Sequence, residues 1–139
     1  MPAHSIRVLV AEDYPPFRRA LASIMQSRPG LQIICEVEDG LEAVQKAEEL
    51  KPDLILLDIG LPKLNGLQAA RQVLKRAPES KIIFVTQETS PELVQEALSL
   101  GAQGYVVKTR LESDLLVAVE AVLQGRQFVS SGLSSGNAG

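Results

Sequence analysis

The clearest sign of architecture in this 139-residue chain is the run Asp53-Leu54-Ile55-Leu56-Leu57-Asp58. Its four central residues are all apolar, and successive side chains of a strand point to opposite faces of the sheet. A strand of this composition has to be buried on both faces, as the central strands of parallel sheets are. The run therefore predicts a central parallel strand that ends in the carboxylate of Asp58.

Further apolar runs lie on both sides of this strand, and an amphipathic segment follows each of them. We predict strands at residues 6–10, 32–37, 53–57, 82–85 and 104–107, each followed by a helix. Alternation of this kind favours a parallel sheet with helices on both faces. The sequence therefore predicts an α/β fold: a doubly wound, five-stranded parallel sheet of the flavodoxin-like kind, with strand order 2-1-3-4-5.

Composition narrows the classes of function. The chain carries 14 basic and 17 acidic residues, a net charge of −3, so it lacks the basic surface of a DNA-binding domain. A single cysteine, Cys35, can form neither an internal disulfide nor a zinc site, which favours the cytoplasm. No apolar run approaches the roughly 20 residues that span a bilayer, so we expect no membrane segment. His4 is the only histidine, near the start of the chain, which excludes histidine-dependent catalytic dyads and triads.

Polar side chains follow four of the predicted strands, at the point where each strand ends. The residues are Glu12 and Asp13 after the first strand, Asp58 after the third, Thr86 after the fourth and Lys108 after the fifth. In an open α/β sheet, ligands bind beyond the carboxyl ends of the strands, near the switch in strand order. The sequence therefore predicts that these side chains share one site.

The residue types at this predicted site suit phosphoryl chemistry. Three neighbouring carboxylates repel one another unless a cation neutralises them, and Mg²⁺ suits a site of carboxylates, water and phosphate oxygens. Lys108 adds a second positive charge and Thr86 a hydroxyl donor, so the cluster can stabilise a phosphoryl group that arrives at a carboxylate. Aspartate is a known covalent phosphoryl acceptor. The residues therefore predict a phosphorylatable aspartate, Asp58, beside Mg²⁺.

Each of these residues also has an ordinary structural explanation when it is taken alone. Asp58 could be a turn residue, Lys108 a surface lysine and Thr86 a solvated strand end. The two acidic residues after the first strand could favour the first turn of the next helix through its dipole. Tyr105, in the fifth strand, could simply pack at a sheet edge. The joint placement of the polar residues is what favours a functional site.

Several segments of the chain resemble the receiver domain of response regulators. They are Val8-Leu9-Val10-Ala11-Glu12-Asp13, Leu56-Leu57-Asp58-Ile59-Gly60-Leu61-Pro62 with Asn65-Gly66, Thr86, and Gly104-Tyr105-Val106-Val107-Lys108. The resemblance covers about residues 5–125, and its motifs are specific in both type and order. It implies a two-component signal transduction protein in which Asp58 accepts a phosphoryl group from a sensor histidine kinase.

The resemblance also implies a role for each site residue. The Mg²⁺ ligands that it implies are side-chain oxygens of Glu12, Asp13 and Asp58 and the backbone carbonyl of Gly60. Thr86 would bind the phosphoryl group and Lys108 would pair with it, while Tyr105 would rotate inward as the signal. Phosphorylation and dephosphorylation would be directed only at the domain itself, so we expect no enzyme acting on external substrates.

Two further segments resemble regulators that carry a helix-turn-helix output domain of the LuxR or NarL type. They are Tyr14-Pro15-Pro16-Phe17-Arg18 and Gly125-Arg126-Gln127-Phe128-Val129-Ser130. We therefore expect residues 5–125 to form the receiver domain, and residues 126–139 a flexible tail or the start of a linker to an output domain outside this chain. Phosphorylation would then promote a homodimer, and DNA would be bound for transcription regulation only through that output domain.

Two positions depart from the common receiver pattern. Gln87 follows Thr86 where most receivers have a small residue, and its bulk could slow or gate access to the site. Thr109 follows Lys108 where many receivers have proline, often after a cis bond. A cis bond costs about 2.5–4 kcal/mol before a residue other than proline and about 0.5–1 kcal/mol before proline.

Three other functions are alternatives. A phosphohydrolase of the haloacid-dehalogenase-like kind typically has a second aspartate two residues after the nucleophile, where this chain has Gly60. A nucleotide- or flavin-binding protein usually shows a glycine-rich phosphate loop, and neither G-x-G-x-x-G nor G-x-x-x-x-G-K-[ST] occurs here. A stand-alone or phosphorylation-independent receiver could act as a protein-docking module, and Gln87 and Thr109 keep this alternative open.

Overall fold

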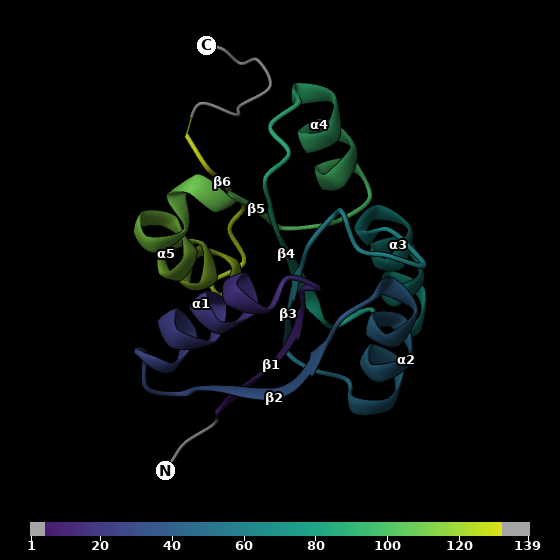
Figure 1. Cartoon of the computed structure of the whole chain (residues 1–139), viewed down its shortest axis with the longest axis horizontal. Coiled ribbons are helices and arrows are strands. Elements are labelled where there is room, and N and C mark those ends of the chain that lie inside the picture. Colours follow the sequence, from purple (N-terminus) through teal and green to yellow (C-terminus); the bar gives the residue numbers. More distant parts are fainter. Residues whose placement is uncertain (1–4, 132–139) are drawn as a thin grey trace.

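A parallel sheet of six strands forms the centre of the computed structural model, which describes residues 5–131 (Figure 1). The strands are β1 (Ile6–Ala11), β2 (Leu31–Val37), β3 (Leu54–Leu57), β4 (Lys81–Thr86), β5 (Gly104–Val107) and β6 (Phe128–Val129). Their order in the sheet is β2-β1-β3-β4-β5-β6, and every neighbouring pair is parallel. The predicted order 2-1-3-4-5 is confirmed, with one short strand added beside β5.

Helices in the described part of the chain cover both faces of this sheet (Figure 1). On one face lie α1 (Pro15–Gln26) and α5 (Leu111–Leu123), and on the other lie α2 (Gly40–Leu50), α3 (Gly66–Arg76) and α4 (Pro91–Ser99). A 3₁₀ turn, Lys108–Arg110, joins β5 directly to α5. The predicted doubly wound α/β architecture is therefore confirmed.

The central strand β3 is buried on both faces, as its composition predicts. All its side chains are 0% exposed. Ile55 and Leu57 belong to the apolar cluster under α2, α3 and α4, whereas Leu54 and Leu56 belong to the cluster under α1 and α5. This strand therefore ties the two halves of the core together, and its carboxyl end delivers Asp58 to the edge of the sheet.

The sixth strand is the main difference from the five-stranded prediction. The backbone N–H of Phe128 donates to the carbonyl of Gln103 at 3.0 Å, and that of Ser130 donates to the carbonyl of Tyr105 at 2.9 Å. Two residues are too few to show the alternation by which a strand is predicted from sequence. The strand lies within the segment 126–139, for which the sequence predicts a tail or linker. His4 and residues 132–139 lie outside the described residues.

Close backbone packing fixes the loop between β3 and α3. Asn65 caps α3, because its side chain accepts a hydrogen bond from the Gln68 N–H at 2.9 Å. The N–H of Gly66 donates to the carbonyl of Ile59 at 2.7 Å. A Cβ atom on Gly66 would lie only 2.2 Å from the carbonyl oxygen of Asp58, so this approach requires glycine. The start of α3 is thereby held against the backbone of Asp58.

Candidate phosphoacceptor site

The side chains predicted to share a site meet at one pocket, of ≈ 400 Å³, beyond the carboxyl edge of the sheet. The lining residues are Glu12, Asp13, Tyr14, Asp58, Gly60, Thr86, Gln87, Glu88 and Lys108. They follow or end β1, β3, β4 and β5, whose parallel pairing brings their carboxyl ends to the same edge. Of the predicted site residues, only Tyr105 does not border this pocket.

Three carboxylates form the acidic side of the pocket. Carboxylate oxygens of Glu12, Asp13 and Asp58 all lie within 4.8 Å of one another. Glu12 and Asp58 are buried, whereas Asp13 is exposed. The Asp58 N–H donates to the carbonyl of Ala11 at 3.2 Å, so the pairing of β3 with β1 continues into the site. That continued pairing is what holds Asp58 beside the two acidic residues after β1.

Glu12 is a buried carboxylate with incomplete partners. Its Oε2 accepts a hydrogen bond from the Tyr14 N–H at 3.1 Å, and its Oε1 forms an ion pair with Lys108 Nζ at 3.0 Å. Oε1 accepts no hydrogen bond from the described residues. Burial, and then the negative charge of Asp58, raise the pKa of Glu12 above its ordinary value, and Lys108 opposes this effect. More positive charge near Oε1 would therefore stabilise the ionised form of Glu12.

This donor set fits a hard divalent cation such as Mg²⁺. Carboxylate oxygens are the ligands that such ions prefer, with several positions left for water or phosphate. The charge of Lys108 alone does not balance three carboxylates, and the exposed carboxylate of Asp13 leaves one side open to solvent. Gly60, whose carbonyl is the further predicted ligand, borders the same pocket and donates its N–H to Asp58 Oδ1 at 3.3 Å.

Lys108 is held between the two buried carboxylates. Its Nζ lies 3.0 Å from Glu12 Oε1 and 3.3 Å from Asp58 Oδ2, and it also lies 4.3 Å from the centre of the Phe17 ring. The lysine side chain is 16% exposed, so it is largely removed from solvent. The sequence predicts that Lys108 shares a site with the acidic residues, and the structure brings it into direct contact with two of them.

Thr86 borders the pocket with its hydroxyl turned to the following loop. Its Oγ1 accepts a hydrogen bond from the Glu88 N–H at 3.3 Å, and its side chain is buried. Within residues 5–131, no hydrogen bond joins Thr86 to Asp58. The hydroxyl therefore lies in the same pocket as the predicted phosphoacceptor, and it is hydrogen-bonded to the backbone of the β4–α4 loop.

Tyr105, for which the resemblance to receivers implies an inward rotation, lies inward in this structure. Its side chain is 0% exposed, and its hydroxyl donates to the carbonyl oxygen of Glu88 at 2.9 Å. Burial is the main cause that raises the pKa of Tyr105 to about 12. The alternative of packing at a sheet edge is wrong, because Tyr105 pairs with Val129 of β6. Tyr105 and Thr86 thus both contact the same loop residue, Glu88.

Arg18 supports the site in a way that the sequence analysis did not foresee. Its Nη1 donates to the backbone carbonyl of Glu12 at 2.8 Å, and the same guanidinium forms ion pairs with Glu36 at 3.3 Å and Glu38 at 3.5 Å. Arg18 thereby ties the end of β1 to the end of β2. The only signal in the sequence was its place in a receiver-like segment, which named no partner for the side chain.

The two residues that depart from the receiver pattern are both exposed. Gln87 is exposed and lines the pocket, so its side chain is placed at the entrance. Thr109 is exposed in the 3₁₀ turn after β5. The described residues contain no cis peptide bond, so the bond before Thr109 is trans.

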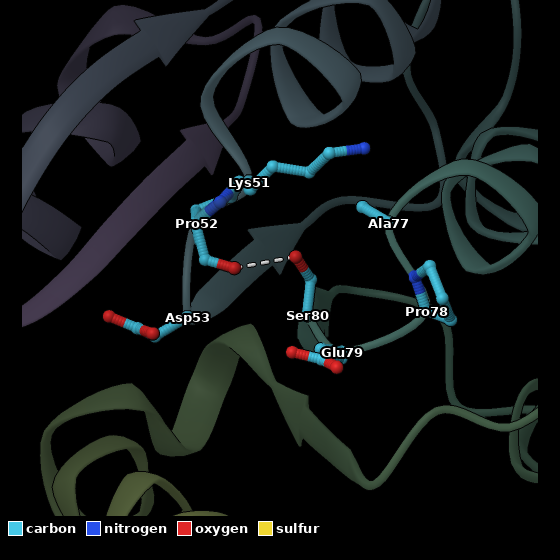
Figure 2. A pocket seen from close by; sticks show the side chains of 7 residues that line it. All are labelled: Lys51, Pro52, Asp53, Ala77, Pro78, Glu79 and Ser80. Carbon is cyan, nitrogen blue, oxygen red and sulfur yellow. Dashed lines mark hydrogen bonds between the residues drawn. The ribbon is translucent and has the colours of Figure 1, made fainter.

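A second pocket lies at the opposite end of the sheet, where β3 and β4 begin (Figure 2). It is lined by Lys51, Pro52, Asp53, Ala77, Pro78, Glu79 and Ser80. Its polar groups are used to join loops: Ser80 Oγ donates to the carbonyl of Pro52 at 2.5 Å, and Asp53 Oδ2 accepts from the Arg7 N–H at 2.8 Å. This pocket lacks the set of converging charges found beside Asp58.

Within residues 5–131, no helix combines the length and the apolar composition needed to cross a membrane.

Comparison with known proteins agrees with this geometry. A family model described as the response regulator receiver domain matches residues 8–120. The chain is 32% identical over 126 residues to the transcriptional regulatory protein DegU of Brevibacillus brevis, and this match covers 91% of this chain and 53% of DegU. It is 33% identical over 125 residues to the response regulator GacA of Pseudomonas viridiflava, and this match covers 90% of this chain and 58% of GacA. The chain therefore spans about half the length of these curated relatives.

Solved structures with the same fold include regulators of the LuxR and NarL types. A two-component response regulator of the LuxR family from Aurantimonas sp. SI85-9A1 superposes with a TM-score of 0.88 at 29% identity, covering 93% of this chain and 92% of that chain. The signal receiver domain of the putative response regulator NarL from Mycobacterium tuberculosis gives a TM-score of 0.83 at 27% identity, covering 89% and 100%. Because the family model spans most of the sequence, the chain belongs to the family of response regulator receiver domains.

Proposed function

We propose that Asp58 is the phosphoacceptor of a two-component signalling protein. The observation that carries this proposal is the contact of 3.3 Å between Lys108 Nζ and Asp58 Oδ2 in a pocket that holds two further carboxylates. In the proposed step, a bond forms between phosphorus and a carboxylate oxygen of Asp58 while the bond between phosphorus and the donor breaks. The electron pair of the broken bond stays with the donor, which is a histidine nitrogen if the donor is a histidine kinase.

The surrounding side chains suit the charge that arrives with the phosphoryl group. Lys108 would exchange part of its contact with Asp58 for a phosphoryl oxygen, and the Thr86 hydroxyl would donate a hydrogen bond to another. The residues that would hold Mg²⁺ are Glu12, Asp13, Asp58 and, through its carbonyl, Gly60. When bound, Mg²⁺ would supply positive charge against both the carboxylates and the phosphoryl oxygens. The same site would also release phosphate by hydrolysis, so its chemistry would be directed only at its own aspartate.

The partners follow from the family and are part of the same proposal. We infer a sensor histidine kinase as donor, in the cytoplasm, and regulation of transcription as the output. DegU and GacA are each longer than this chain, which supports a whole protein that also has a helix-turn-helix output domain outside this chain. Phosphorylation would then promote a homodimer that presents two DNA-binding domains to two half-sites. This chain has a net charge of −3 and would reach DNA only through such a domain.

A phosphorylation-independent docking module is the second candidate, and one observation favours it. Gln87 is exposed at the entrance of the pocket, where its bulk would hinder the approach of a phosphodonor to Asp58. A receiver that is not phosphorylated would present the same surface of α4, β5 and α5 whether or not a phosphodonor is present. Such a protein would bind its partner equally well before and after treatment with a phosphodonor.

Incubation with acetyl phosphate and Mg²⁺, followed by intact-protein mass spectrometry, separates the two candidates. The phosphoacceptor proposal predicts a gain of one phosphoryl group that disappears in Asp58→Asn and in samples without Mg²⁺. Asp53→Asn is the matched control, because Asp53 lies at the other end of the same strand and lines the second pocket. Equal labelling of Asp58→Asn and the unchanged protein would exclude Asp58, and no labelling of either would favour the docking module.

A further inference from the structure

The aromatic ring of Phe17 packs against the Lys108 ammonium group, which also contacts the carboxylates of Glu12 and Asp58. The ring centre lies 4.3 Å from Nζ, while Glu12 Oε1 and Asp58 Oδ2 lie at 3.0 and 3.3 Å. A cation within about 6 Å of an aromatic ring centre is attracted by the negative face of the ring. Lys108 is therefore enclosed by two carboxylates and one ring, and its side chain is only 16% exposed.

The position of Phe17 is fixed by the start of α1. Pro15 and Pro16 form the first turn of this helix, and the Phe17 N–H donates to the carbonyl of Tyr14 at 3.0 Å. The ring is partly buried and packs against the apolar cluster between α1, α5 and the sheet. The ring thus contacts both the apolar core and the ammonium group of Lys108.

A ring differs from a third polar neighbour in the contact that it makes. A carbonyl or carboxylate at this point would accept a directed hydrogen bond, which would have to break whenever the ammonium moves. The attraction to a ring face comes from the quadrupole of the whole π-system and has no single acceptor atom. Lys108 can therefore turn from Asp58 Oδ2 toward an incoming phosphoryl oxygen while it stays in contact with Phe17.

We propose that Phe17 is a positioning residue for Lys108: its ring holds the ammonium beside Asp58 and lets it pass to the phosphoryl group. This inference rests on the proposed function of Asp58, because it concerns the transfer of a phosphoryl group to that carboxylate. Phe17 is not among the residues that line the pocket beside Asp58. In the sequence, Phe17 stands out only as part of the segment Tyr14-Pro15-Pro16-Phe17-Arg18 that resembles LuxR- or NarL-type regulators.

Stepwise fluorination of the ring tests the proposal with almost no change in shape. Mono-, di- and trifluorophenylalanine at position 17 weaken the negative ring face progressively and preserve the apolar packing. The initial rate of Asp58 phosphorylation by acetyl phosphate should fall with each fluorine, by about two- to fivefold across the series, as expected for a contact at a partly exposed site. Phe128 is the matched control, because it is also partly buried and packs against the same apolar cluster. Fluorination there should leave the rate unchanged.

A second readout does not depend on phosphorylation. The ring of Phe17 should shift the NMR signals of the Lys108 ε-methylene protons upfield, and Phe17→Leu should abolish this shift while Phe128→Leu retains it. Rates that are constant across the Phe17 series, or that fall equally in the Phe128 series, would overturn the proposal, as would an unshifted Lys108 signal. If Asp58 is never labelled, the function proposed above fails, and the Lys108 shift still decides whether Phe17 holds the ammonium.

Discussion

The buried hydroxyl of Ser130 donates a hydrogen bond to Asp114 Oδ2 across 2.7 Å. The same hydroxyl oxygen accepts a hydrogen bond from the Val107 N–H at 3.1 Å. The segment after α5 is thereby joined to α5 itself and to the residue before Lys108. Burial alone would raise the pKa of Asp114, but hydrogen bonds from Ser130, Ser113 and Arg110 outweigh it and hold the pKa below its ordinary value.

Ser130→Ala should therefore lower the free energy of unfolding by about 1–3 kcal/mol, because the buried Val107 N–H and Asp114 Oδ2 each lose a hydrogen bond. Urea unfolding at neutral pH measures this loss. Since the pKa of Asp114 is lowered on folding, its stabilisation is present above the ordinary value of 3.8 and is lost as the pH falls through the folded pKa. Ser113→Ala is the control, because the Ser113 hydroxyl is exposed and contacts the other oxygen of Asp114. An equal loss in both variants would contradict the anchoring role of Ser130.

Tyr105→Phe should cost about 1 kcal/mol near neutral pH, because the hydrogen bond to the Glu88 carbonyl disappears. In alkali the comparison changes. The pKa of Tyr105 rises from 10.0 to about 12 on folding, so the stability that comes from keeping the phenol neutral is complete below pH 10 and is lost toward pH 12. Urea unfolding at a series of pH values should thus show the unchanged protein losing stability in this range more steeply than Tyr105→Phe. Parallel curves for the two proteins would show that Tyr105 is solvated.

Mg²⁺ should raise the midpoint of thermal unfolding, because a ligand of the folded state stabilises it by mass action. At a tenfold excess over Kd the gain is about 1.4 kcal/mol. Asp13→Ala should remove most of this gain, since Asp13 supplies one of the clustered carboxylates. Glu88→Gln should retain it, because Glu88 lines the same pocket outside the cluster. A gain that survives in Asp13→Ala would place the ion elsewhere.

Thr86→Ala should still be phosphorylated, yet its β4–α4 loop should respond little. Thr86 accepts a hydrogen bond from the Glu88 N–H, and Glu88 accepts one from Tyr105, so a hydroxyl drawn toward the phosphoryl group would release this loop. Amide hydrogen exchange at Glu88, with and without beryllofluoride, measures the response. Thr109→Ala, at an exposed threonine beside the pocket lysine, should respond like the unchanged protein. If beryllofluoride changes the exchange at Glu88 as much in Thr86→Ala as in the unchanged protein, Thr86 does not couple the phosphoryl group to this loop.

The sequence was sufficient for the features that depend on patterns of residue type. The apolar run 54–57 predicted the central strand, and the polar residues that follow the strands predicted which side chains would meet. Parallel strands align their carboxyl ends at one edge, so this part of the site follows from topology alone.

The remaining features depend on side-chain rotamers and on backbone pairing that composition does not reveal. β6 spans two residues and is held by main-chain hydrogen bonds, which almost any sequence can supply. The contact of Phe17 with Lys108 joins the first turn of one helix to the end of a distant strand. Tyr105 looked like an edge residue only because β6 was not predicted. These contacts join residues that are far apart in the sequence, so no local pattern of residue types predicts them.

Reductive trapping of the phosphorylated protein tests the central claim most directly. After treatment with acetyl phosphate and Mg²⁺, borohydride cleaves an aspartyl phosphate and converts that aspartate to homoserine, which peptide sequencing by mass spectrometry locates. We predict homoserine at position 58 and retention of Asp13 and Asp53 as aspartate. Homoserine at another position, or an unmodified Asp58 in protein that carries a phosphoryl group, would contradict the assignment.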